Sequence, residues 1–333
     1  MPSIETLTQV GMPSPRWRRP GTLAKAWLTT LVTGAYLTPL ALRAQASSQT
    51  SHLFLTETRV IDESDALSVQ GTNVSTSGSL VAWSRNTDYL LLWRKGTGTQ
   101  APAKLGQAVL LRPVAAAFDT DSTVEVVDAG RAEIFRISVS GHVLGQRRIS
   151  APNSIEVAAR SALGWYVGGF DHDSAFRLYL ETSQNSRHVV LPVSDSEVRS
   201  ASVVLSAYGK SVLVTSLHPP FRTFRISSHA PHVTTFTPLS ALGRVPSDVL
   251  LPASAWISLP IVPLDKGFIQ SLADLRSDRR IFILYDQYGN FVRRSELDVP
   301  LAFYCSLPAR QLLIAARHSR TMDLVEYRWE WRP

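Results

Sequence analysis

One unit recurs along the chain, a hairpin of two apolar strands, and a single copy leaves apolar faces exposed to water. The segment VEVVDAGRAEIFRISVSGHVLGQRRI, residues 124–149, alternates strands and turns. Segments aligned with its first strand follow one another at roughly 40 to 57 residues, the range of a four-stranded propeller blade. They are SLVAWSR, GWYVGGF, SVLVTSL, GFIQSLA and QLLIAAR. Because only packed copies can hide these faces, we expect antiparallel sheets arranged in a ring.

The ends of the chain predict how the ring closes. The sixth hairpin, which ends near Trp331, is followed by no further strand, whereas HLFLTETRVI, from His52 to Ile61, has no local partner. Pairing these two segments removes two open sheet edges that would otherwise favour aggregation. The sequence therefore predicts an all-β, six-bladed β-propeller over residues 47–333, with the N-terminal strand completing the last blade.

Two stretches resemble the repeats of NHL-type six-bladed propellers of exported bacterial proteins. They are FDTDSTVEVVDAGRAEIFRISVSGHVL and GFIQSLADLRSDRRIFILYDQYGNFV, and the turn in YDQYGNFV is the closer match. The resemblance covers about two blades, and the other blades share only the strand pattern. It implies the same ring architecture. Gly141 and Gly289 also have a local explanation, since a tight hairpin turn needs a residue that adopts positive φ.

The first 46 residues have the pattern of a secretory signal peptide. Basic residues Arg16, Arg18 and Arg19 precede the apolar run AWLTTLVTGAYLTPLAL, and Ala44 and Ala46 occupy small-residue cleavage positions. We expect cleavage after Ala46 and a location outside the cytoplasm, either periplasmic or secreted. An uncleaved anchor, twin-arginine export and a start at Met12 remain alternatives. No membrane span is expected after cleavage.

Charge and cysteine content argue against a nucleic-acid-binding protein and against a fold stabilised by disulfides. The formal net charge is +7, but the N-terminal segment contributes about +4 and roughly +3 remains for the other residues. This balance, together with the half-buried strand pattern of RWEWRP, gives no reason to expect a nucleic-acid partner. Cys305 is the single cysteine, so no intrachain disulfide forms. We expect a monomer stabilised by packing.

In a four-stranded propeller blade, the loop between the second and third strands opens on one face of the ring. In this chain, each of these loops carries an ionisable residue. A ring of such side chains suits a polar small molecule, a glycan or a protein, although surface loops are polar in most proteins. Trp83, beside this ring, is a candidate for stacking on a ligand. The candidate ligand-binding residues are Trp83, Arg85, Asp128, Asp171, His172, Asp173, His218, Asp274, Arg317 and His318.

A divalent metal at the channel mouth is an alternative. Gluconolactonase-like six-bladed enzymes hold calcium there with Glu, Asn and Asp, and resemblance to them implies ligands among the carboxylates of the ring with Glu156 and Asn153. At least three of Asp128, Asp171, Asp173, Asp274, Glu156 and Asn153 would have to converge. Phosphate-loop, zinc-protease and serine-hydrolase motifs are absent from the sequence.

Three functions follow from these features. The first is an exported, non-enzymatic propeller that binds a polar small molecule, glycan or protein at its channel face, with no cofactor. The second is a metal-dependent, lactonase-like hydrolase or lyase that uses calcium or a similar cation. The third is a scaffold of an envelope assembly with an apolar patch on one rim.

Overall fold

The computed structural model describes residues 41–43, 52–62, 69–95, 101–189, 203–209, 211–219, 221–227, 233–236, 255–264, 266–298, 301–307, 312–318 and 322–332. All of these belong to the compact unit Pro39–Pro333. The predicted signal peptide lies outside the described residues except for one short strand, β1 (Ala41–Arg43). No helix in these ranges is long and apolar enough to cross a membrane.

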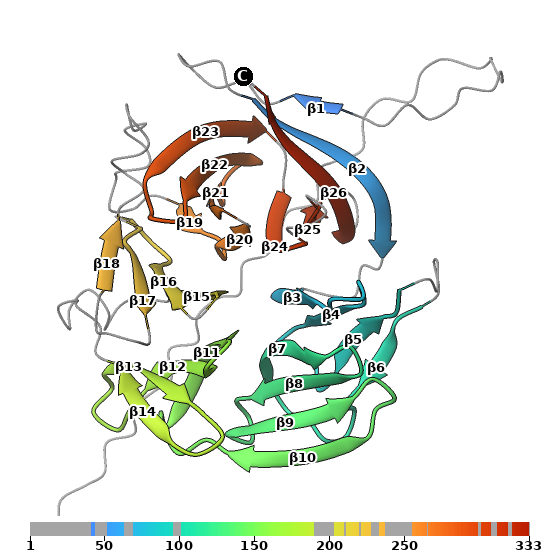
Figure 1. The fold of residues 1–333 in the computed structure, drawn as a ribbon, viewed down its shortest axis with the longest axis vertical. Coiled ribbons are helices and arrows are strands. Elements are labelled where there is room, and N and C mark those ends of the chain that lie inside the picture. The colour runs from blue at the N-terminus through green and yellow to red at the C-terminus, as the bar shows by residue number, and fades with distance from the viewer. Residues whose placement is uncertain are drawn as a thin grey trace, which may run out of the picture. The chain divides into compact units, whose positions relative to one another are not determined.

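Six small antiparallel sheets form a ring, which confirms the predicted six-bladed β-propeller (Figure 1). The strands of the first three blades follow chain order. Blade 1 contains β3 (Gly71–Val74), β4 (Leu80–Trp83), β5 (Leu90–Trp93) and β6 (Ala103–Leu105). Blade 2 contains β7 (Pro113–Thr120), β8 (Thr123–Asp128), β9 (Glu133–Ser138) and β10 (Val143–Arg148). Blade 3 contains β11 (Ser154–Ser161), β12 (Gly164–Phe170), β13 (Phe176–Glu181) and β14 (Ser186–Val189).

The remaining blades complete the ring. Blade 4 contains β15 (Val203–Tyr208), β16 (Ser211–Ser216), β17 (Thr223–Ser227) and β18 (Val233–Phe236). Blade 5 contains β19 (Trp256–Ser258), β20 (Val262–Leu264), β21 (Gly267–Asp274), β22 (Arg279–Asp286) and β23 (Phe291–Asp298). Blade 6 contains β24 (Leu301–Leu307), β25 (Leu312–His318), β26 (Met322–Arg332), β2 (His52–Asp62) and β1.

The N-terminal strand closes the last blade, as the sequence predicted. β2 pairs antiparallel with β26 from His52↔Arg332 to Asp62↔Leu324 (Figure 1). On the inner face of this pair, Leu55 is buried against the core that β25 and β26 share with blade 5. β1 adds a fifth strand at the outer edge by pairing with β2, within the segment predicted to be a signal peptide. The closing hydrogen bonds therefore join segments from opposite ends of the chain.

Apolar clusters fill the spaces between adjacent blades. Between blades 2 and 3, for example, Val127 and Ile134 pack with Trp165 and Val167 in one buried cluster. Each other pair of neighbouring blades has a cluster of its own. Each sheet thus buries two faces against its neighbours, and burial of apolar area of this kind stabilises a fold by roughly 25 cal/mol per Å².

Two details refine the predicted strands. Gly141 and Gly289 adopt φ of 94° and 88°, so both hairpin turns have the predicted positive φ. The segment WISLPIV, residues 256–262, does not form one continuous strand in blade 5: it spans β19 and the start of β20, which both pair with β21. Pro260 lies between the two pieces and has no N–H to donate to the ladder, which explains the interruption.

Candidate ligand-binding channel

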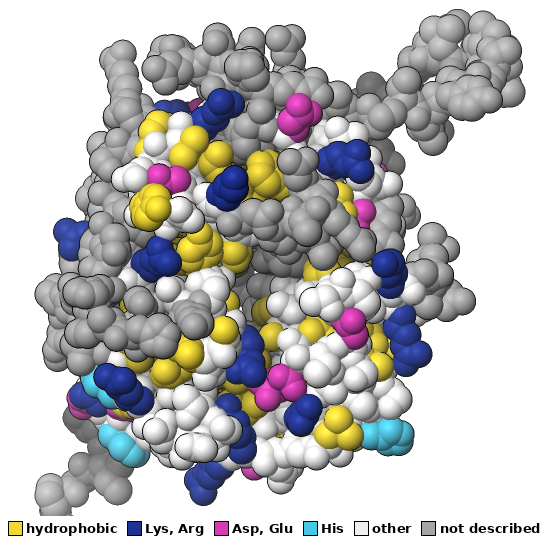
Figure 2. All heavy atoms as spheres, in the orientation of Figure 1, with side chains coloured by type: hydrophobic (Ala, Val, Ile, Leu, Met, Phe, Trp, Pro, Cys, Tyr) yellow, Lys and Arg dark blue, Asp and Glu magenta, His cyan; other side chains and the backbone are white. Residues whose placement is uncertain are grey.

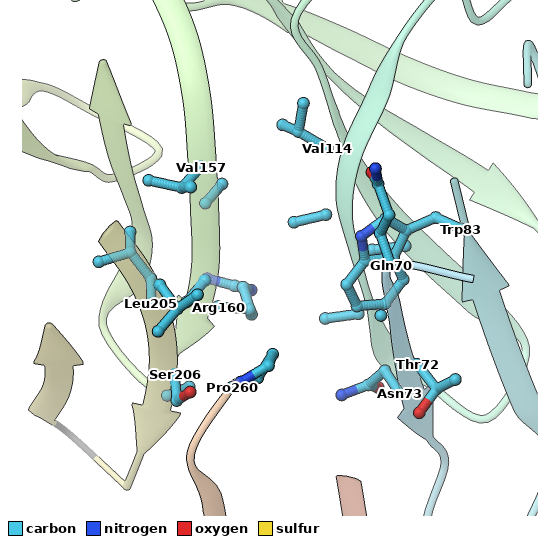
Figure 3. Close-up of a pocket in the computed structure, with 18 of the residues that line it drawn as sticks. Gln70, Thr72, Asn73, Trp83, Val114, Val157, Arg160, Leu205, Ser206 and Pro260 are labelled. Atoms are coloured by element: carbon cyan, nitrogen blue, oxygen red, sulfur yellow. The ribbon is translucent and has the colours of Figure 1, made fainter. Parts of the chain in front are cut away.

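A cavity of about 560 Å³ lies at the centre of the ring, lined by the inner strands of the blades. β3, β7, β11 and β15 contribute to its wall, together with the prolines at positions 260 and 263. Most of this lining is valine, alanine or leucine. Figure 3 shows Trp83 and Gln70 on one wall, with Val157, Leu205 and Arg160 on the opposite wall. The first strands therefore line the channel, as expected for this fold.

The indole of Trp83 is the large aromatic side chain predicted for ligand stacking, and it borders this cavity. Trp83 ends β4 and pairs with Gly71 on β3. A Cβ atom added to Gly71 would lie 2.1 Å from a carbon of the indole, so glycine at this position allows the ring to lie against the β3 backbone. Trp83 is only half-buried, which leaves part of the indole accessible from the channel.

Arg85 also borders the cavity and reaches across the channel mouth from blade 1 to blade 3. Its backbone N–H donates to the side-chain oxygen of Gln70 at 2.9 Å, and its guanidinium donates to the carbonyl oxygen of Glu156. The Glu156 carboxylate lies 3.7 Å from Arg85 Nη1, and both side chains are about one-third exposed (36% and 31%). Burial lowers the pKa of Arg85, as does the charge of Arg112, whereas Glu156 acts in the opposite direction.

Asp128 was predicted to contact a ligand, but its side chain is not open to solvent. Its side chain is completely buried, and its Oδ2 accepts the backbone N–H groups of Leu111 at 2.7 Å and Arg112 at 3.0 Å. Oδ1 accepts the backbone N–H of Arg131 at 2.8 Å. A buried carboxylate with three such donors holds a loop in place. Asp128 therefore fixes the backbone that leads into β7.

Arg177 brings the carboxylates of Asp171 and Asp173 together. The guanidinium of Arg177 lies 2.5 Å from Asp171 Oδ2 and 2.5 Å from Asp173 Oδ2. The hydroxyl of Tyr179 donates to Asp171 at 2.7 Å. Burial acts to raise the pKa of Asp171, but these donors outweigh it and the pKa is lowered. His172, between the two carboxylates, is exposed.

The other predicted positions lie on separate blades and have separate partners. Asp274 is buried and accepts the N–H of Arg276 at 3.0 Å and the hydroxyl of Ser277 at 2.9 Å. Arg317 pairs with Glu57 at 2.6 Å and with Asp323 at 2.9 Å. His218 is exposed in the loop after β16, and His318 ends β25. The structure thus brings Trp83 and Arg85 to the cavity.

The carboxylates considered for a metal do not converge within the described ranges. No group of three or more His, Cys, Asp or Glu side chains in those ranges is placed to hold a metal ion. Glu156 is paired with Arg85 and accepts the hydroxyl of Ser154 at 2.8 Å. Asn153 is exposed, and its backbone hydrogen bond to Asp171 helps to lower the pKa of that carboxyl group.

Polar residues that the sequence analysis did not select lie at the other end of the inner strands. Asn73 Oδ1 accepts the backbone N–H of Phe118 at 3.0 Å, an arrangement that fixes its amide. Arg160 Nε lies 3.1 Å from Glu125, which also accepts the indole N–H of Trp165 at 2.8 Å. Both Asn73 and Arg160 line the cavity (Figure 3).

Arg112 is a further residue near the channel that the sequence analysis did not select, although its position in the sequence indicates which face of the ring it lies on. It immediately precedes β7, and the segment entering a first strand opens on the same face as the second-to-third loops. Arg112 Nη2 donates to the carbonyl oxygen of Ile155 at 3.1 Å. In Figure 2, basic and acidic side chains lie side by side in the region between β7 and β11, near apolar side chains around the central hollow.

Comparisons with known proteins agree with this architecture. No protein-family model matches the chain, and no curated protein matches its sequence. Among solved structures, the calcium-binding protein regucalcin from Agrobacterium tumefaciens superposes with a TM-score of 0.55 at 12% identity, over 83% of this chain and 96% of that one. A streptogramin B lyase structure superposes with a TM-score of 0.50 at 11% identity, over 84% and 88% of the two chains. The chain is a six-bladed β-propeller, consistent with the NHL-like repeats in its sequence.

Proposed function

We propose that the protein is a non-enzymatic binding protein that holds a small molecule in the central channel. The observation that carries this proposal is the cavity of about 560 Å³ lined by the inner strands and bordered by Trp83 and Arg85. Small-molecule sites commonly occupy roughly 300 to 1,000 Å³ and combine apolar walls with a few fixed polar groups. The channel has both properties.

The contacts of the ionisable loop residues favour binding inside the channel over binding at the loops between the second and third strands. Asp128 and Asp274 are buried and accept hydrogen bonds from their own loops, and Arg317 is paired within blade 6. Such groups would have to give up these partners in order to bind a ligand, at a cost comparable to the hydrogen bonds lost. The half-buried indole of Trp83 needs no such exchange.

The same contacts disfavour the lactonase-like alternative. A metal-dependent reaction of that type requires several oxygen donors directed at one point. The Asp128 carboxylate is instead held by three backbone N–H groups, and the Asp171 carboxylate is held by Arg177 and Tyr179. We therefore propose that binding needs no resident cofactor.

We further propose that the protein acts as a monomer outside the cytoplasm, after removal of residues 1–46. The support is the N-terminal pattern of basic residues, apolar run and small-residue cleavage positions. Cell fractionation with N-terminal sequencing of the exported protein tests this location. A protein retained in the cytoplasm with its N-terminus intact would contradict it.

A thermal-shift screen of small molecules against the full chain, followed by a blocking variant, tests the channel. A ligand that binds only the folded state raises the unfolding temperature. Ala158 on β11 is half-buried and lines the cavity, so Ala158→Phe should fill part of it and abolish the shift produced by any hit. Ala103→Phe, at an exposed position on β6, is the matched control and should leave the shift unchanged. Equal shifts in both variants would place binding outside the channel.

A further inference from the structure

Two arginines from different blades converge on one short segment at the channel mouth. Arg85 follows β4 in blade 1 and donates to the Glu156 carbonyl, whereas Arg112 precedes β7 in blade 2 and donates to the Ile155 carbonyl at 3.1 Å. Register between β11 and β12 shifts between Ile155 and Val157, so Glu156 is the extra residue of a β-bulge. A bulge removes backbone groups from the ladder, which explains why these carbonyls can accept from side chains.

The charges at this point are not balanced. Glu156 is the carboxylate that pairs with Arg85, at 3.7 Å. Over the described ranges, no carboxylate forms an ion pair with Arg112, whose side chain is half-buried. Of the two guanidinium groups, that of Arg85 therefore has a carboxylate partner, whereas that of Arg112 contacts a backbone carbonyl. Each guanidinium has five N–H donors in a planar fork, so both retain donors beyond the backbone contacts.

Both arginines are held in place by contacts at their backbones. The buried carboxylate of Asp128 accepts the N–H groups of Leu111 and Arg112, and the carbonyl of Arg112 accepts the N–H of Ala129 at 2.9 Å. Gln70 performs a similar role by accepting the N–H of Arg85. Donors that are fixed before binding lose less conformational entropy when a ligand arrives.

We infer that Arg85 and Arg112, here called the arginine pair, bind the anionic end of an amphipathic organic anion whose apolar body enters the channel beside Trp83. This inference rests on the proposed function and specifies its ligand class. The shared chemistry is a compact oxyanion, either carboxylate or phosphate, because guanidinium forks bind both. The apolar walls and the indole of Trp83, two residues from Arg85, accommodate the rest of the ligand.

Calorimetric titration with three matched compounds tests this inference on the full chain at low ionic strength. 2-Naphthoate and 2-naphthyl phosphate carry the two oxyanions on one apolar body, and 2-naphthamide is the neutral isostere of the carboxylate. We expect at least one anion to bind about tenfold or more tightly than the amide, the effect of one charge-assisted hydrogen bond. The tighter of the two anions identifies the oxyanion.

Variants separate the arginine pair from general electrostatic attraction. Arg112→Gln should remove most of the anion preference, and Arg112→Lys should retain part of it because the charge remains while the fork is lost. Arg148→Gln, on the exposed outer strand β10, changes the net charge equally and should leave the preference intact. Unfolding temperatures of all three variants verify that each is folded.

The outcomes distinguish the two proposals. Equal binding of anions and amide, or a preference that survives Arg112→Gln in a folded variant, overturns the role of the arginine pair while the channel remains a binding site. Failure of all three compounds to bind the folded wild-type protein overturns both the ligand class and the channel site for compounds of this size.

Discussion

Arg317 on β25 donates to the carboxylate of Glu57 on β2 with an Nη1–Oε2 distance of 2.6 Å, and so joins residues 260 positions apart in the sequence. The same guanidinium contacts Asp323 on β26 at 2.9 Å. These contacts lie on the strands that close the ring. The residue predicted as a ligand contact in blade 6 therefore ties the N-terminal strand to the blade that it completes.

Removal of the closing strand should prevent stable folding. A chain that begins at Ser47 keeps β2, whereas a chain that begins at Glu63 loses it, with the buried Leu55 and the hydrogen bonds to β26. Loss of Leu55 alone is expected to cost about 2 to 5 kcal/mol. Urea unfolding should show a cooperative transition for the first chain and aggregation or no transition for the second. Cooperative unfolding of both chains would show that closure by β2 is dispensable.

Asp128→Asn should lower the free energy of unfolding by about 2 to 3 kcal/mol, because a neutral amide replaces a carboxylate that accepts three backbone N–H bonds. It should also weaken the preference of the channel for anions, since the backbone of Arg112 loses its support. Urea unfolding and titration with 2-naphthoate measure the two effects. Asp88→Asn, at an exposed position, is the control and should change neither. A stability change without any effect on anion preference would limit Asp128 to a structural role.

Gly71→Ala should displace the indole of Trp83, because the added Cβ would lie 2.1 Å from a ring carbon. Overpacking of this kind typically costs about 1 to 3 kcal/mol. We expect a changed tryptophan emission spectrum and weaker binding of 2-naphthoate. Gly145→Ala on β10 adds a Cβ with no heavy atom within 4 Å and serves as the control. An unchanged spectrum and affinity in Gly71→Ala would show that Trp83 does not depend on this glycine.

Stability should fall at acidic pH through Asp171. Although burial acts to raise its pKa, the Tyr179 hydroxyl and Arg177 lower it below the usual value of about 3.9. A lowered pKa in the folded state means that the stabilising effect is present above about pH 4 and is lost as the pH falls through the folded-state pKa. Unfolding free energies of wild type and Asp171→Asn should differ near pH 7 and converge toward about pH 2. A difference that stays constant over this range would contradict the ionic contribution.

The periodicity of the sequence predicted the architecture well because the constraint is local and repeated. Apolar alternation, the turns at Gly141 and Gly289 and the unpaired strand from His52 all have direct counterparts in the structure. The split of the first strand in blade 5 was not predicted, although Pro260 gives a physical reason for it. Strand pattern alone does not reveal where pairing along one strand is interrupted.

The candidate site was predicted less completely, because hydrogen-bond partners depend on tertiary structure. Asp128 appeared as an ionisable loop residue, but its burial against the backbone of Leu111 and Arg112 depends on how the loop folds. Trp83 and Arg85 were selected and do border the cavity. Arg112 was overlooked because its convergence with Arg85 on Ile155 and Glu156 joins three blades.

A crystal structure of the full chain with 2-naphthoate provides the most direct measurement of where and how the protein binds. We expect the naphthyl rings inside the channel beside Trp83, with the carboxylate within hydrogen-bond distance of Arg85 and Arg112. A naphthoate bound instead among the loops of Asp171 and Asp173, or outside the ring of inner strands, would contradict binding in the channel.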